Sequence, residues 1–218
     1  MKKVLINGAK GKMGAMIADI ITKNPQLGLE ISVLREEGQD VKGSFDIVID
    51  FSLPEGAAES FKVAKAAGAA YLTGTTNLPE DFVRELQQTK DIPVFFSPNV
   101  SIGVYMFTEV LAYAQKLFAG YDRHLEEIHH IHKKDAPSGT AKAIAAELGF
   151  PVQDIKAIRE GEIVGTHTLV LSSDYEEITL SHVAKKRALF AESAVLVSAW
   201  LVKQKPGFYS MKDYIETK

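Results

Sequence analysis

Short apolar stretches alternate with helical patterns through residues 1–100, and this alternation is the feature that most restricts the fold. The apolar stretches have the length of strands, and most segments between them have apolar residues at helical spacing or a helix-starting proline. We predict strands over residues 3–7, 29–34, 45–51, 70–73 and 92–96, and helices over 12–22, 54–67 and 79–88. Such alternation predicts an α/β fold with a Rossmann-type, doubly wound parallel sheet. Ligands of these sheets bind beyond the carboxyl ends of the strands.

A glycine-rich stretch, GAKGKMG, follows the first predicted strand and opens the first helix. A dinucleotide-binding fingerprint requires this order of strand, glycine turn and helix. Gly8 permits the tight turn, Gly11 lets a pyrophosphate approach the backbone, and Gly14 permits close packing of helix on strand. The alternative is an ordinary turn between a strand and a helix. We favour a dinucleotide site formed by Gly8, Ala9, Lys10, Gly11, Lys12 and Met13.

The loops after the other strands lie at the same edge of a parallel sheet, so they are candidate contacts to the same cofactor. These candidates are Arg35, Phe51, Gly74, Thr75, Thr76, Ser97, Pro98, Asn99 and Val100.

Arg35 ends the second predicted strand, where a dinucleotide domain meets the adenosine ribose. An arginine there accepts the 2′-phosphate of NADPH, whereas a carboxylate pairs with the ribose hydroxyls of NADH. Glu36 and Glu37 follow at once, and either carboxylate is an alternative ribose ligand. We predict that both cofactors are used and that Arg35 makes NADPH the preferred one.

The pattern changes near residue 101, where we place a domain boundary. A long apolar helix is predicted over residues 101–119 and a histidine-rich strand over 124–132. A helix over 140–148 and three strand-like stretches, 155–159, 166–171 and 177–183, follow. Strands that succeed one another without helices predict an antiparallel or mixed sheet. A helix over 192–202 and a short tail over 211–215 come next.

Four of the chain's six histidines lie between residues 124 and 132. In a strand, His129 and Lys133 share one face and His130 and His132 the other, so His129 and Lys133 are placed to meet one ligand. The alternative is a solvated strand edge whose charges discourage pairing with another chain. We expect no metal ion here, because the chain has no cysteine and because lysines separate Asp135 from the histidines.

Ser138, Gly139 and Thr140 follow the histidines and open the predicted helix. The free amides and the positive dipole end of a helix N-terminus bind carboxylates and phosphates. Gly139 lets an anion approach the backbone closely. We therefore favour an anion-binding site over a solvated edge.

Composition excludes several other classes of protein. The chain has 218 residues and a net charge of -3, without the basic bias of nucleic-acid-binding proteins. It has no cysteine for disulfides or thiol chemistry, and no apolar run of about 18 residues that would span a membrane. The glycines come too early in MKKVLINGAK for a signal peptide. We expect a cytoplasmic protein without nucleic-acid or membrane partners.

The stretch HHIHKKDAPSGTA at 129–141 resembles the substrate-site signature of the dihydrodipicolinate reductases. Further matches to this family are GAKGKMG, VIDFSLPE at 48–55, TGTT at 73–76, FSPNVSIG at 96–103 and RALFAESA at 187–194. Three positions depart from the family pattern: Arg35 precedes Glu36 where an acid usually precedes an arginine, Val100 stands for phenylalanine, and Lys12 for arginine.

The resemblance implies a Rossmann domain over residues 1–100 and about 190–218, and a mixed α+β substrate and oligomerisation domain over 101–189. It implies a homotetramer that uses NADPH or NADH to reduce 4-hydroxy-tetrahydrodipicolinate, with loss of water, in lysine and diaminopimelate biosynthesis. His129 matches the proton donor of the family, and Lys133 matches the second donor and carboxylate partner. The matched substrate-binding residues are His130, Ser138, Gly139 and Thr140.

Two other functions are compatible with part of the sequence. A different nicotinamide-dependent reductase of a small dicarboxylate would have the same fold but leaves the histidine–lysine pair and the SGT turn unexplained. A non-catalytic nucleotide sensor would keep the glycine loop and need neither His129 nor Lys133.

Overall fold

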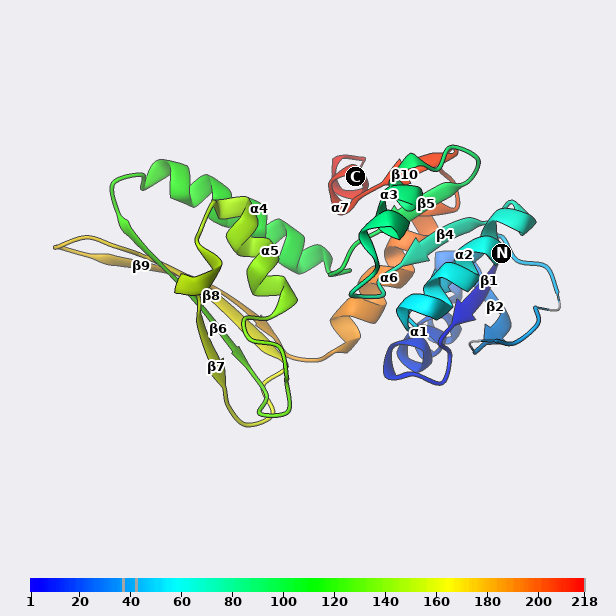
Figure 1. Ribbon diagram of the computed structural model, residues 1–218, viewed down its shortest axis with the longest axis horizontal. Coiled ribbons are helices and arrows are strands. Elements are labelled where there is room, and N and C mark those ends of the chain that lie inside the picture. The colour runs from blue at the N-terminus through cyan, green and yellow to red at the C-terminus, as the bar shows by residue number, and fades with distance from the viewer. Residues whose placement is uncertain (37, 42, 218) are drawn as a thin grey trace. The chain divides into compact units, whose positions relative to one another are not determined.

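The computed structural model describes residues 1–36, 38–41 and 43–217. The chain divides into two compact units, one formed by Met1–Val100 with Ala188–Lys218 and the other by Ser101–Arg187. The second unit is thus inserted into the chain of the first, as the colours of Figure 1 show. No helix within the described ranges is long and apolar enough to cross a membrane.

The first unit contains a parallel sheet of six strands in the order β10-β5-β4-β3-β1-β2 (Figure 1). Every neighbouring pair in it is parallel. The strands are β1 (Lys2–Asn7), β2 (Leu29–Arg35), β3 (Ile47–Asp50), β4 (Ala70–Thr73), β5 (Pro93–Phe96) and β10 (Gly207–Tyr209). Every residue of β3 and of β4 is buried, as expected for central strands covered on both faces. The predicted Rossmann-type sheet is confirmed.

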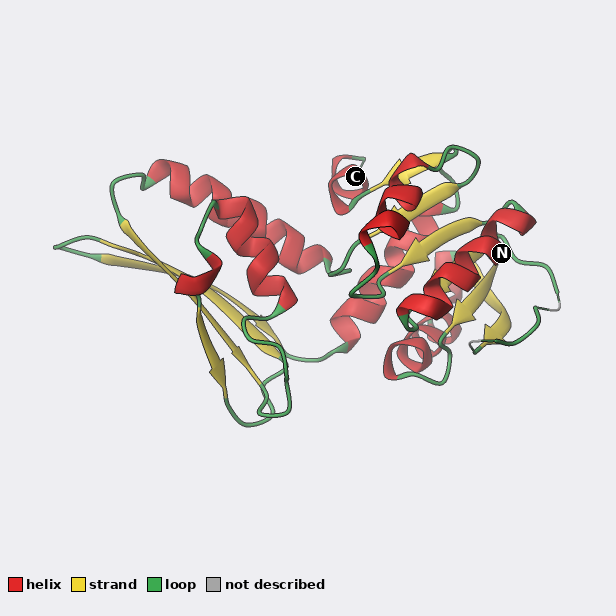
Figure 2. Ribbon diagram, in the orientation of Figure 1, coloured by secondary structure: helices red, strands yellow, loops and turns green. Residues whose placement is uncertain are grey.

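Helices cover both faces of this sheet (Figure 2). One layer contains α1 (Lys12–Lys23) and α6 (Ala188–Leu201), which pack against each other, and the other contains α2 (Pro54–Ala67) and α3 (Glu80–Gln88). A short helix, α7 (Met211–Glu216), follows β10. The order of strands places the topological switch point between β1 and β3, so the loops after these two strands border the ligand crevice expected of the fold.

The sixth strand, β10, was not predicted from the sequence. Its three residues are only partly buried and follow Lys205-Pro206, which is typical of a helix stop. The strand pairs with β5 from Gly207 to Tyr209. A strand this short lacks the alternating pattern by which longer strands are found.

The second unit has a four-stranded mixed sheet in the order β7-β6-β8-β9. Its strands are β6 (Asp122–His129), β7 (Lys156–Arg159), β8 (Gly165–Ser172) and β9 (Glu177–Ala184). β6 is parallel to β7 and antiparallel to β8, and β8 is antiparallel to β9. The predicted mixed sheet is therefore confirmed.

Two helices, α4 (Ile102–Leu117) and α5 (Gly139–Leu148), cover one face of this mixed sheet (Figure 2). Leu111 of α4 and Ile144 of α5 share a buried apolar cluster with Leu125, Leu169 and Leu171 of the strands. The opposite face carries Thr168, Val170, Ser181 and Val183, which are partly or fully exposed.

Candidate active site

The glycine-rich loop joins β1 to α1 at the carboxyl end of the parallel sheet. Gly8 has a φ of 77°, a conformation that favours glycine, and a Cβ at Gly14 would lie 2.2 Å from the Gly8 carbonyl oxygen. The amides of Gly8 and Ala9 donate to the Arg35 carbonyl at 2.9 and 3.3 Å, which ties the loop to the end of β2. Gly11 precedes α1, whose first-turn amides lack partners within the helix. A loop of this shape fits the pyrophosphate of a dinucleotide.

Arg35 is turned into the protein, with only 5% of the residue exposed. Its guanidinium donates to Asn7 Oδ1 at 2.6 Å, to Glu59 Oε2 at 2.9 Å and to the Gln39 carbonyl at 3.0 Å. The guanidinium that was predicted to accept a 2′-phosphate is therefore paired within the protein. The reason is long-range: the carboxylate and the amide that bind Arg35 come from α2 and β1.

Glu36, the next residue, contacts the glycine-rich loop. Its Oε1 accepts a hydrogen bond from the Lys10 amide at 2.7 Å, so the carboxylate is held beside the loop. The side chains of Lys10 and Lys12 are exposed, and Met13 is partly buried. Glu37, the other acid that was considered for the ribose, lies outside the described residues.

Asp50, at the end of β3, joins the loops around the switch point. Its fully buried carboxylate accepts hydrogen bonds from the Asn7 amide group at 2.7 Å and from the hydroxyls of Ser52, Thr73 and Thr75 at 2.6 to 2.8 Å. The Thr75 hydroxyl also accepts from the Ser52 amide at 3.1 Å. The predicted cofactor residue Thr75 thus uses its side chain to fix the loop, and its side chain is not turned outward.

Three more of the predicted cofactor residues lie together. A Cβ at Gly74 would stand 2.3 Å from Phe51 Cε1 and 2.9 Å from Val100 Cγ2, so glycine is needed where the loops after β3, β4 and β5 meet. In the last of these loops, Ser97 Oγ donates to the Asn99 carbonyl at 2.8 Å. Thr76 and Pro98 are exposed.

The histidine strand of the second unit ends earlier than predicted. β6 stops at His129, and the chain turns, with the Lys133 amide donating to the His130 carbonyl at 3.1 Å. The alternation that was expected to place His129 and Lys133 on one strand face does not reach Lys133, so that argument is wrong. Lys133 Nζ lies 2.7 Å from Asp135 Oδ1, and this ion pair helps to lower the pKa of Asp135 against the effect of its burial.

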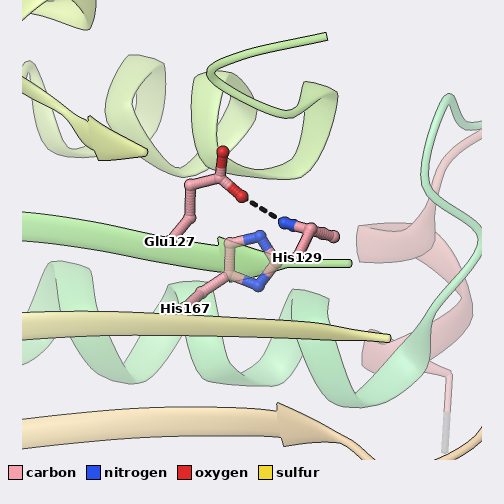
Figure 3. A group of neighbouring side chains, drawn as sticks. All are labelled: Glu127, His129 and His167. Carbon is pink, nitrogen blue, oxygen red and sulfur yellow. Dashed lines mark hydrogen bonds and ion pairs between the residues drawn. The ribbon is translucent and has the colours of Figure 1, made fainter. Parts of the chain in front are cut away.

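His129 lies in a buried polar cluster with Glu127 and His167, which point toward one another in Figure 3. Glu127 and His129 share the helix-covered face of β6, and Glu127 is paired with His167 of β8. Glu127 Oε2 contacts His129 Nδ1, while Glu127 Oε1 accepts from Arg159 at 2.8 Å and from the Ser138 amide at 3.2 Å. The Glu127 side chain has no exposed area.

The charges of this cluster follow from burial and from its partners. Burial alone would raise the pKa of Glu127, but the hydrogen bonds from His129 and Arg159 outweigh it and lower the pKa to about 2. Burial, with His129 nearby, lowers the pKa of His167 to about 4. Near neutral pH, Glu127 is therefore an anion and His167 is neutral.

The start of α5 contacts the same cluster. Ser138 is the N-cap residue: its Oγ accepts from the Ala141 amide at 3.1 Å and lies 3.3 Å from His167 Nε2. Gly139 is exposed and Thr140 half-buried, at the first turn of the helix. The predicted anion site at Gly139 and Thr140 therefore directly follows Ser138, whose hydroxyl contacts His167.

His130 is directed to another partner. Its Nε2 lies 2.9 Å from the Arg187 guanidinium, and burial together with this cation lowers the pKa of His130. Arg187 is the last residue of the second unit.

Sequence reasoning missed Glu127, Arg159 and His167. Glu127 was within reach, because the period of two in a strand places it on the same face as His129. Arg159 and His167 lie 32 and 40 residues after Glu127 in the chain, and only the pairing of β6 with β7 and β8 brings them to the cluster.

Comparison with known proteins identifies the family. Residues 2–100 match the family described as dihydrodipicolinate reductase, N-terminus, and residues 103–215 match dihydrodipicolinate reductase, C-terminus. The chain is 35% identical to the 4-hydroxy-tetrahydrodipicolinate reductase of Methanocorpusculum labreanum, covering 99% of each chain. It is 39% identical to the enzyme of that name from Bdellovibrio bacteriovorus, over 99% of this chain and 97% of the relative.

A solved structure has the same fold. The dipicolinate-bound dihydrodipicolinate reductase of Paenisporosarcina sp. TG-14 matches with a TM-score of 0.77 at 18% identity, over 96% of this chain and 97% of that one. A protein of Pseudomonas aeruginosa described as a probable aspartate-semialdehyde dehydrogenase matches more distantly, with a TM-score of 0.57 at 11% identity over 93% of this chain and 99% of that one. The resemblance seen in the sequence is confirmed: the chain belongs to the dihydrodipicolinate reductase family, a family of NAD(P)H-dependent oxidoreductases.

Proposed function

We propose that this enzyme reduces 4-hydroxy-tetrahydrodipicolinate to tetrahydrodipicolinate in lysine and diaminopimelate biosynthesis, with His129 as the proton donor and Lys133 assisting. The observation that carries the proposal is the position of His129, which lies in a buried cluster bonded to the Ser138 N-cap of α5. The positive end of the α5 helix dipole favours a carboxylate beside Gly139 and Thr140, and four residues of loop join Lys133 to the Ser138 N-cap. A cyclic dicarboxylate needs such an anion site beside an acid.

The reaction requires one hydride and one proton. Loss of water from the substrate leaves a conjugated imine ring. When bound, the reduced nicotinamide supplies the hydride, which brings one hydrogen and two electrons. The ring then holds an extra electron pair at carbon and becomes neutral by gaining a proton. We assign that proton to His129: its N–H bond breaks as the ring C–H bond forms, and the imidazole recovers a proton from solvent.

The substrate carboxylate is assigned to Lys133, Gly139 and Thr140, with His130 and Ser138 in support. Lys133 contributes charge, and Gly139 contributes an exposed backbone next to the helix N-terminus. In the structure Lys133 is paired with the Asp135 carboxylate at 2.7 Å. A substrate carboxylate would compete with this internal carboxylate for the same ammonium group.

The decisive experiment follows nicotinamide absorbance after freshly made substrate is added to the enzyme. Calorimetric titration with pyridine-2,6-dicarboxylate, in the presence and absence of NADPH, then distinguishes three functions: the proposed reductase, a reductase of another substrate and a nucleotide sensor. The proposal expects turnover and dicarboxylate binding that competes with substrate. A reductase of another substrate would show no turnover of this one, and a nucleotide sensor would bind NADPH and no dicarboxylate.

We propose that Glu36, not Arg35, controls the choice between NADH and NADPH. The support is geometric: Arg35 is bonded to Asn7, Glu59 and Gln39, whereas the Glu36 carboxylate lies against the Lys10 amide in the glycine loop. A carboxylate there bonds to ribose hydroxyls and repels a 2′-phosphate. This reverses the preference for NADPH expected from the sequence.

Glu36→Gln should therefore raise the ratio of kcat/KM for NADPH to that for NADH by about tenfold, because the variant loses one charge repulsion of about 1.4 kcal/mol. Arg35→Lys serves as the contrast: it should lower the melting temperature, since a buried fork of hydrogen bonds is lost, and leave the ratio within about twofold. Steady-state kinetics with both cofactors measure the ratios. An unaltered ratio in Glu36→Gln, or an inverted one in Arg35→Lys, would return the role to Arg35.

We also propose that copies of the chain associate through the uncovered face of the mixed sheet, in the homotetramer that the resemblance implies. Thr166, Thr168 and Val170 of β8 lie opposite Val183, Ser181 and Thr179 of β9 on this face. Val183 on this face is 56% exposed. A sheet with one uncovered face can bury that face against a second sheet.

Val183→Lys should lower the mass measured by light scattering, because a charge would be buried between copies. Leu53→Lys, which changes a 63% exposed apolar residue of the first unit, should leave the mass unchanged. A wild-type enzyme with the mass of one chain would contradict the proposal.

A further inference from the structure

We propose that Glu127, held by Arg159, is a positioning residue that fixes the orientation and the protonated nitrogen of His129. The inference rests on the proposed role of His129 as proton donor and goes beyond it. Glu127 itself does not touch the substrate. It acts through the imidazole, by keeping a hydrogen on Nδ1 so that Nε2 is the nitrogen that exchanges a proton.

The first support is the way in which Glu127 is bound. A fully buried carboxylate is costly unless its oxygens are satisfied, and here both are. Oε2 contacts His129 Nδ1, and Oε1 accepts from Arg159 and from the Ser138 amide. The carboxylate is therefore held by residues of three elements, β6, β7 and the start of α5. Two of these contacts fix Oε1, which leaves Oε2 directed at the His129 imidazole.

The second support is the space around the other ring nitrogen. His129 Nε2 lies over Gly165, where a Cβ would stand only 2.9 Å away. The ring is thus held by the Glu127 carboxylate at Nδ1, and Gly165 leaves space for it at Nε2 because glycine has no side chain. The same face of β8 places His167 next, with its ring centroid 5.3 Å from that of His129.

The third support is that Arg159 contacts both Glu127 and the loop that carries Lys133. Its guanidinium donates to Glu127, to the Lys133 carbonyl at 3.3 Å and to the Asp135 carbonyl. One cation therefore holds both the carboxylate behind His129 and the loop that carries Lys133. Among the described residues, the charged or titratable groups around the His129–Glu127 pair are His167 from β8, Arg159 from β7 and His130 from the turn after β6. Lys133 and His182 act in turn on His167.

A metal ion is the alternative use of these side chains. One ligand atom each of Glu127, His129 and His167 lie within 4.8 Å of one another. A cation bound there would stand beside the Arg159 guanidinium and would have to displace the contact between Glu127 and His129. The positioning role is therefore favoured, and metal content becomes an outcome of the test.

The test compares Glu127→Gln with Glu126→Gln in the full-length enzyme. Glu126 is the neighbouring acid on the opposite face of β6 and pairs with Lys156 at 2.6 Å. Glu127→Gln should lower kcat about 100-fold and change the dissociation constant for pyridine-2,6-dicarboxylate less than threefold, as expected for loss of proton transfer without loss of binding. Glu126→Gln should change neither.

Two further readouts separate this inference from the role of His129 itself. Nitrogen NMR of labelled histidine should show one tautomer for His129 in the wild type and a mixture in Glu127→Gln. The double variant Glu127→Gln/His129→Gln should be no slower than His129→Gln alone, since a positioning residue has no effect without its partner. If His129→Gln keeps full kcat while the NMR difference persists, the proton-donor role fails and the positioning contact stands.

Wild-type kcat and a single His129 tautomer in folded Glu127→Gln would overturn the inference, as would additive losses in the double variant. One equivalent of zinc in the purified enzyme, with activity lost to a chelator, would also overturn it, because Glu127 would then be a metal ligand. Should Glu127→Gln not fold, Arg159→Lys keeps the charge but loses the planar fork, and a kcat within twofold of wild type would count against the anchoring by Arg159.

Discussion

Replacing His129 with glutamine should lower kcat by about 100-fold or more and change KM much less. A positioned acid contributes about 10²- to 10⁴-fold to a proton transfer, and glutamine keeps the size of the side chain without a proton to give at that acidity. The effect is expected on kcat because His129 is only 7% exposed, is bonded to Glu127 and is assigned to proton transfer and not to carboxylate binding. Steady-state kinetics with substrate at saturation measure it.

His132→Gln is the matched control. His132 lies three residues further along, its side chain is 71% exposed, and it faces Glu162 at 3.6 Å. Its kcat should equal that of the wild type. A folded His129→Gln variant with unaltered kcat would remove His129 from the role of proton donor.

Replacing Lys133 with alanine should weaken both substrate binding and turnover. The variant loses a charge-assisted hydrogen bond of about 1.5–3 kcal/mol, which corresponds to roughly a 10- to 150-fold loss in affinity for pyridine-2,6-dicarboxylate. It also leaves the Asp135 carboxylate without its ion-pair partner Lys133, and that negative charge would repel the dicarboxylate. Calorimetry measures the affinity, and kcat/KM measures the effect on the reaction.

Lys134→Ala controls for net charge, because Lys134 is an exposed neighbour of Lys133. It should change affinity less than twofold. Adding Asp135→Asn to Lys133→Ala should recover part of the lost affinity, since the uncompensated carboxylate is then neutral. Equal dicarboxylate affinity in Lys133→Ala and wild type would show that Lys133 is not the carboxylate partner.

The sequence predicts the layers of the first unit well, because its signals are local. The strand–glycine–helix order at residues 3–22 and the buried runs at β3 and β4 depend only on neighbours in the chain. β10 escapes prediction because three residues that complete a sheet edge have no pattern of their own. The end of β6 at His129 escapes for a similar reason: the turn is set by contacts of residues 130 and 131 with the loop at 161–163.

The sequence predicts which residues lie near the site better than it predicts where their side chains point. Arg35 stands at the predicted place, yet it is turned inward by Asn7 and Glu59, which come from other elements. Thr75 is likewise turned toward Asp50. In both cases a buried hydrogen bond to a distant residue decides the direction of the side chain, and no spacing within the sequence reports it.

The insertion of the second unit into the first has a consequence for synthesis on the ribosome. Residues 101–187 emerge complete before α6 and β10, which belong to the first unit, have been made. Until then α1 has no α6 to pack against, and β5 remains an open edge strand. The nascent first unit thus exposes apolar surface through the translation of almost ninety further residues. We expect the inserted unit to reach its native packing first, and the nucleotide-binding unit to become stable only when its last thirty residues have left the ribosome.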